Sequence, residues 1–120
     1  MYSEYLNAEL DDEIYKHLPE YKRYLDLLRT IGAWQFEKEA FVKVANERSD
    51  LTDGETPISI LEKLYNYSII GFYRAGGRGH GGSEYVFRYK ETRTKFDPTA
   101  FRFRVHSGLI EVLGLKKSTV

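Results

Sequence analysis

Residues 69–89 decide the fold of this chain, and they run Ile69-Ile-Gly-Phe-Tyr-Arg-Ala-Gly-Gly-Arg-Gly-His-Gly-Gly-Ser-Glu-Tyr-Val-Phe-Arg-Tyr89. At both ends of this stretch the side chains alternate with a period of two, which is typical of β-strands. The segment between the strands is dominated by glycine, which suits a tight connection. We therefore predict a strand, a glycine-rich connection that carries Arg78 and His80, and a second strand.

The connection also contains a literal Gly-x-Gly-x-x-Gly, at Gly77, Gly79 and Gly82. A dinucleotide-binding loop needs a helix directly after its glycines, because the amide groups at the start of that helix bind the pyrophosphate. Here the glycines lead into a strand pattern. The sequence therefore argues against a nucleotide site and favours the tip of a hairpin.

The apolar periodicities around this hairpin predict the other elements of the fold. They are helices over 3–18, 19–32, 37–47 and 57–67, a short strand over 33–36, a strand with Phe101, Phe103 and Val105 on one side, and a last short helix through Leu109, Val112 and Leu113. Thr56 and Pro57 are expected to begin the fourth helix, Gly32 to end the second, and Ser107 to cap the last. The acidic segment 49–55 is expected to be a solvated turn.

The order helix, short strand, helix, helix, hairpin is that of a winged helix-turn-helix. We therefore predict an α+β, mostly helical fold with an N-terminal helical pair over 1–32 and a winged-helix core over 33–120. In that core the hairpin and the short strand would form a small sheet, with the wing near 74–83 and a C-terminal strand and short helix. Residues 57–67 would be the helix that can enter a DNA groove.

Composition limits the class of protein. The chain has 120 residues and no cysteine, which fits one small domain without disulfides or thiolate metal sites and favours a cytoplasmic setting. It lacks both an apolar run long enough to span a bilayer and the pattern of a signal peptide. The three histidines, His17, His80 and His106, lie in different predicted elements, and no nucleophile or carboxylate pair is arranged for catalysis. We expect no enzyme, no metal and no cofactor.

Charge is distributed unevenly along the chain. Residues 1–70 hold 8 Lys and Arg against 14 Asp and Glu, whereas residues 71–120 hold 10 against 4, so the halves carry about −6 and +6. Two interpretations remain open: the halves attract each other within the fold, or the basic half forms a surface for a partner.

The predicted nucleic-acid site combines the outward side of helix 57–67, which would bind through its N-terminal part from Pro57, with the base and tip of the wing. Its candidate residues are Ser59, Lys63, Asn66, Arg74, Arg78, His80, Arg88 and Lys90. The helix contributes a nearly neutral set, because Glu62 offsets Lys63. Weak binding to the phosphate backbone is therefore expected rather than recognition of bases.

Several short runs, taken together, resemble a known family. They are Pro19-Glu-Tyr21, Thr30-Ile-Gly32, Phe36-Glu-Lys-Glu-Ala-Phe41, Ile60-Leu-Glu-Lys-Leu-Tyr-Asn-Tyr-Ser-Ile-Ile-Gly71, Tyr85-Val-Phe-Arg-Tyr89, Phe96-Asp-Pro98 and Val105-His-Ser-Gly-Leu109. This order is similar to the C-terminal winged-helix region of bacterial AAA/STAND-like, origin-recognition-like P-loop ATPases, often labelled DNA-repair ATPases.

The resemblance implies a non-catalytic module that normally follows an ATPase domain, since no Walker motif is present in this chain. Such a module would bind duplex DNA. The alternative is a regulatory module that docks on an ATPase core or forms a homodimer through aromatic side chains such as Tyr2, Tyr5 and Tyr73.

Overall fold

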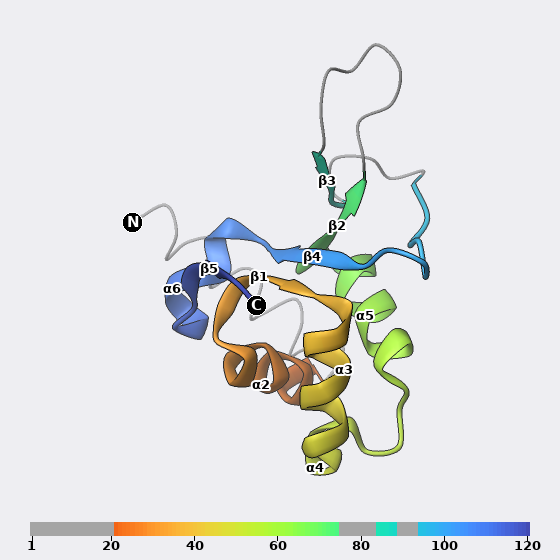
Figure 1. Ribbon diagram of the computed structural model, residues 1–120, viewed down its shortest axis with the longest axis vertical. Coiled ribbons are helices and arrows are strands. Elements are labelled where there is room, and N and C mark those ends of the chain that lie inside the picture. Colours follow the sequence, from red (N-terminus) through yellow and green to blue (C-terminus); the bar gives the residue numbers. More distant parts are fainter. Residues whose placement is uncertain (1–20, 75–83, 89–93) are drawn as a thin grey trace.

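The computed structural model describes residues 21–74, 84–88 and 94–120 (Figure 1). The predicted helix over 3–18 and the candidate residues Arg78, His80 and Lys90 lie outside the described residues. None of the helices within the described ranges is long and apolar enough to cross a bilayer.

The described chain contains runs of successive helices and of successive strands. The helices are α2 (Tyr21–Ile31), α3 (Lys38–Glu47), α4 (Ser49–Thr52), α5 (Pro57–Asn66), the 3-10 turn η1 (Ser107–Leu109) and α6 (Ile110–Leu113). The strands are β1 (Ala33–Glu37), β2 (Ile70–Arg74), β3 (Glu84–Val86), β4 (Arg102–Val105) and β5 (Lys116–Thr119). The fold is therefore α+β and about half helical, rather than mostly helical as the sequence predicted.

The strands form one mixed sheet in the order β3-β2-β4-β1-β5. The β2–β3 hairpin is present as expected, but it does not lie beside β1. Strand β4 lies between them and is antiparallel to both, so that Phe103 is paired in register with Phe36 of β1 and with Phe72 of β2. Strand β4, predicted as a C-terminal addition to the winged-helix core, is thus the central strand of the sheet.

Strand β5 was not predicted, because all four of its residues are exposed and show no alternation. Backbone hydrogen bonds hold it parallel to β1: the Lys116 amide donates to the Gly32 carbonyl at 2.9 Å, and the Val120 amide donates to the Gln35 carbonyl at 2.9 Å. A strand held by main-chain bonds at a sheet edge needs no apolar side chains.

Aromatic side chains join the helices to one face of the sheet. The ring of Phe36 stacks on Phe41 of α3 and on Phe103 of β4, with centroids 5.8 and 5.7 Å apart. The ring of Tyr65 of α5 lies 5.3 Å from that of Phe72 of β2. Figure 1 shows the consequence: α2, α3 and α5 lie on one side of the sheet, and the hairpin projects away from them.

Local signals at two helix ends are confirmed. The Thr56 hydroxyl accepts a hydrogen bond from the Ser59 amide at 3.2 Å, with Pro57 in the first turn of α5. Gly32 follows α2 with φ +73°, a conformation that favours glycine.

Three local predictions were wrong. The side chain of Phe101 is 52% exposed, because β4 begins only at Arg102. The cap of η1 is His106, whose Nδ1 accepts from the Gly108 amide at 2.9 Å, and Ser107 is the first residue of the turn. The segment predicted as a solvated turn contains α4, whose Leu51 is buried.

Gly71 allows a close approach between β2 and the residues after β3. A Cβ atom built at Gly71 would lie 2.6 and 2.7 Å from two ring carbons of Phe87 and 2.7 Å from the Val86 carbonyl oxygen. The Phe87 ring is 7% exposed, so it covers the backbone of β2 at this point. The contact fixes the base of the hairpin on the sheet.

We expect Gly71→Ala to lower the free energy of unfolding by about 1–3 kcal/mol, because neither the ring nor the carbonyl has room for a methyl group. Urea denaturation followed by circular dichroism measures the change. In a double-mutant cycle the cost should become smaller when Phe87→Ala is also present. An unchanged stability of Gly71→Ala would contradict the packing seen at this position.

Candidate nucleic-acid interface

Helix α5 places the predicted site residues in two separate regions. Ser59 lies in its first turn and Asn66 at its end, and seven residues of helix, about 10 Å at 1.5 Å per residue, separate them. Lys63 lies between them. The structure therefore joins only part of the predicted set to the hairpin.

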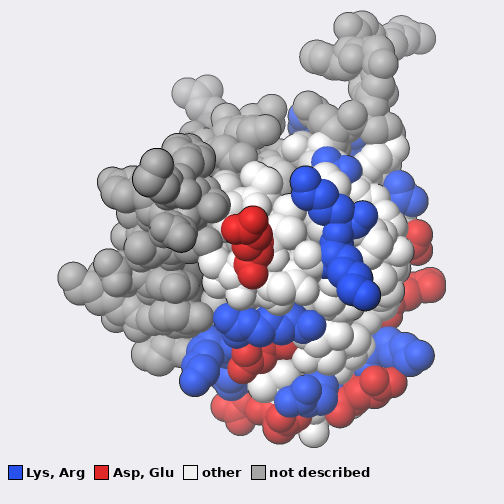
Figure 2. Space-filling view, turned by 90° about the vertical axis from the view of Figure 1, so that its left-hand side faces the viewer, with Lys and Arg blue, Asp and Glu red and all other residues white. Residues whose placement is uncertain are grey.

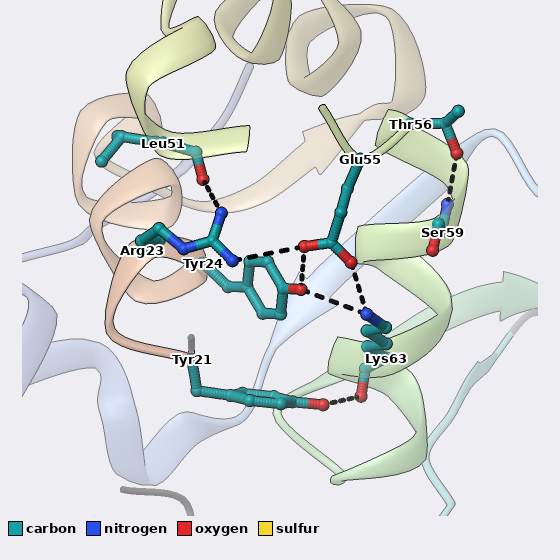
Figure 3. Close-up of polar contacts among 8 residues, drawn as sticks. All are labelled: Tyr21, Arg23, Tyr24, Leu51, Glu55, Thr56, Ser59 and Lys63. Carbon is teal, nitrogen blue, oxygen red and sulfur yellow. Dashed lines mark hydrogen bonds and ion pairs between the residues drawn. The ribbon is translucent and has the colours of Figure 1, made fainter. Parts of the chain in front are cut away.

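Lys63 is directed toward α2 and the segment before α5 (Figure 3). Its ammonium group donates to the Glu55 carboxylate and lies 3.4 Å from the Tyr24 hydroxyl oxygen. Its backbone carbonyl accepts a hydrogen bond from the Tyr21 hydroxyl at 2.7 Å. These contacts compensate the charge of Lys63 within the fold.

Glu55 is the centre of this cluster, which we call the Glu55 cluster (Arg23, Tyr24, Glu55 and Lys63). The carboxylate is 21% exposed, accepts hydrogen bonds from Tyr24 and Lys63, and lies 3.5 Å from Nη2 of Arg23. The same guanidinium donates from Nη1 to the Leu51 carbonyl at 3.1 Å, which ties α2 to α4. The cluster thus connects α2, α4 and α5.

Burial of the Glu55 carboxyl alone would raise its pKa. The hydrogen bonds from Lys63 and Tyr24 and the charges of Lys63 and Arg23 outweigh that effect, so the pKa lies below its ordinary value. The hydrogen bond to Glu55 raises the pKa of Lys63 in turn. Both groups are therefore charged at neutral pH, and each stabilises the other.

At the other end of α5 the structure brings two candidate residues together. Nη1 of Arg88, just after β3, donates to Oδ1 of Asn66 at 3.2 Å, and both side chains are exposed. Arg74 is also exposed and is the last residue of β2. Because it follows Phe72 by two residues, it lies on the face of β2 that the helices cover. The hairpin base and the C-terminal end of α5 therefore form one exposed polar region, which we call the wing base (Asn66, Arg74 and Arg88).

Between the described residues, few ion pairs join the two oppositely charged halves of the chain. Among the ion pairs between described residues, only that of Arg102 with Glu37, at 3.7 Å, joins residues 71–120 to residues 1–70. On the side seen in Figure 2, acidic and basic side chains mix around the helical end, whereas Lys and Arg dominate higher up toward the sheet.

No cluster of three or more potential metal ligands occurs in the part of the chain that the structure describes. Comparison of the chain with protein-family models, curated proteins and solved structures gives no match in any of the three. The resemblance in the short sequence runs therefore stays a hypothesis.

Sequence reasoning missed the role of Glu55, because it stands in an acidic segment that has the composition of a surface loop. The only local signal was its position just before the Thr56 cap, and its partners Arg23 and Tyr24 are about 30 residues away in the chain.

We expect Glu55→Gln to lower the free energy of unfolding by about 1–3 kcal/mol at neutral pH, because three neighbours lose a charged partner. The pKa of Glu55 is lower in the folded than in the unfolded chain, so its contribution is complete above the ordinary value of 4.5 and is lost as the pH falls below it. Thermal unfolding between about pH 3 and 7 measures this loss.

The matched control is Glu62→Gln on the exposed side of α5. It makes the same chemical change and should leave both the stability and its pH dependence close to those of the wild type. Equal acid-induced losses in the wild type and in Glu55→Gln would show that the cluster does not set the pH response.

Proposed function

We propose that this chain is a non-catalytic winged-helix module that binds the backbone of duplex nucleic acid weakly. Helices α2, α3 and α5 correspond to the three core helices, and β1, β4 and β2 correspond to the three-stranded sheet. The wing is then the whole connection from β2 to β4, and β3 is an additional strand within it. The observed strand order, with β4 between β1 and β2, supports this assignment.

The observation that carries the proposal is the contact between Arg88 and Asn66. The side chain of Arg88 thereby lies beside the end of α5, on the side of the sheet that the helices occupy. A winged helix approaches duplex DNA with its third helix and its wing together. The wing base supplies this combination.

Contact with phosphates is favoured over recognition of bases. Lys63 is engaged by Glu55, Glu62 is acidic, and Ser59 lies in the first turn away from the hairpin. The remaining groups are the Asn66 amide, whose Oδ1 accepts a hydrogen bond from Arg88, and the guanidinium groups of Arg74 and Arg88. Guanidinium groups bind phosphate oxygens well and carry no sequence information there. The affinity should therefore depend strongly on salt and little on sequence.

The resemblance to the C-terminal region of origin-recognition-like ATPases supports the same proposal. In that setting the module would act beside an ATPase domain. Docking on that domain, or formation of a homodimer, is the rival function, and it predicts a complex that survives moderate salt.

We expect Arg88→Ala to weaken binding of a fluorescein-labelled duplex by a similar factor for unrelated sequences. The slope of log affinity against log salt should fall by about 1, as expected when one phosphate contact is lost. Fluorescence anisotropy at several salt concentrations measures both quantities.

Arg29→Ala is the matched control, because Arg29 pairs with Asp26 on the surface of α2, outside the wing base. It should leave affinity and slope unchanged. Absence of duplex binding at low salt, together with a salt-resistant complex with an ATPase domain or with a second copy in size-exclusion chromatography, would favour the rival function.

A further inference from the structure

The sheet has a second face, opposite the helices, that carries arginine and aromatic side chains. In β4 the core residues Phe103 and Val105 alternate with Arg102 and Arg104, which therefore point away from the helices. Their neighbours come from three other segments of the chain. We call this set the arginine–aromatic face: Trp34, Tyr73, Tyr85, Phe101, Arg102 and Arg104.

Arg104 is held between two rings. Its guanidinium carbon lies 4.3 Å from the centroid of Trp34 and 4.0 Å from that of Tyr85. Its Nε and Nη2 donate to Oε1 of Gln35 at 3.2 and 2.6 Å. No carboxylate of the described residues lies within ion-pair distance of Arg104, so nothing in that part of the chain neutralises its charge.

Arg102 repeats this arrangement two residues earlier. Its guanidinium carbon lies 5.3 Å from the Tyr73 ring and 5.4 Å from the Phe101 ring, and Glu37 is 3.7 Å away at the edge. The rings also contact one another edge to face: Tyr73 lies 5.6 Å from Tyr85 and 5.7 Å from Phe101. Cations and rings thus form one continuous array across β1, β4, β2 and β3.

The array is accessible as well as ordered. Phe101 is 52% exposed, and Trp34, Tyr73, Tyr85 and both arginines are partly exposed. Within the described ranges the helices pack on the opposite face, through Phe36, Phe72 and Phe103. Two arginines against one carboxylate leave this face positively charged.

We propose that the arginine–aromatic face binds single-stranded nucleic acid. A single strand combines phosphates, which complement the guanidinium groups of this face and above all that of Arg104, with flat unpaired bases, which stack on exposed rings. An acidic peptide would satisfy the arginines but has no planar groups to match the rings. A duplex hides the faces of its bases, so it cannot use the rings at all.

This surface is distinct from the wing base, which serves duplex binding in the proposed function. The two lie on opposite faces of the sheet. The inference therefore goes beyond the proposed function, and each can fail without the other.

Trp34 is the only tryptophan in the chain, so its fluorescence reports directly on this face. We expect an oligothymidine of about 15 nucleotides, at about 50 mM salt, to change that fluorescence in a saturable way. Phe101→Ala should weaken the binding about fivefold or more, the lower limit for the loss of one base–aromatic stack. Arg104→Lys keeps the charge but loses the planar stacking, and it should weaken binding also.

The matched control is Val112→Ala, which trims an exposed apolar side chain on α6. It should bind oligothymidine like the wild type. Arg88→Ala should likewise keep its affinity for oligothymidine while losing affinity for duplex, which separates the two surfaces. Thermal unfolding confirms that Phe101→Ala is folded, as expected for a half-exposed side chain.

Three results would overturn the proposal. One is the absence of any fluorescence change with oligothymidine at low salt. Another is equal affinity of Phe101→Ala and Val112→Ala for it. The third is tighter binding of a polyglutamate peptide than of oligothymidine, with the same loss in Phe101→Ala, which would assign the face to an acidic protein segment.

Discussion

Strand β4 joins the two parts of the sheet, since β1 and the β2–β3 hairpin have no pairing with each other except through it. Its inward residue Phe103 pairs in register with Phe36 on one side and with Phe72 on the other. Those two rings are also the ones that contact α3 and α5. The positions of α3 and α5 against the sheet therefore depend on this four-residue strand.

The alternation of β4 gives the molecule two chemically different surfaces. On the helix side Phe103 and Val105 complete the core. On the other side Arg102 and Arg104 are held by rings from neighbouring strands. Stacking on aromatic rings orients a guanidinium group without neutralising it, so these arginines stay charged and positioned.

Sequence reasoning found the elements whose signals are local. The hydroxyl of Thr56, the proline after it and the left-handed Gly32 mark helix ends through short-range chemistry, and period-two alternation marks β2 and β3. The strand order could not be predicted, because alternation shows which side of β4 is buried but not which strands it pairs with. Strand β5 has no side-chain pattern at all, since only backbone bonds define it.

Tertiary contacts also limited what could be predicted from the sequence about the candidate site. Sequence identified Arg88 and Asn66 as polar groups on neighbouring elements, and the structure brings them into contact. It also assigned Lys63 to the nucleic-acid site, whereas that ammonium group is held by Glu55. A charged residue on the outward side of a helix is free to bind a partner only if no residue from a loop pairs with it. Whether Glu55 reaches Lys63 depends on the conformation of the segment before α5, and tertiary contacts determine that conformation.

The separation of β4 from its partners along the chain has a consequence for the order of folding. Arg104 lies 69 residues after Gln35, the residue it faces in β1. Closing so long a loop costs entropy before the new contacts repay it, so pairings of this kind form late and slow the folding of a domain. During synthesis the side chains of Phe36 and Phe72 therefore lack the strand that lies between them until β4 has left the ribosome.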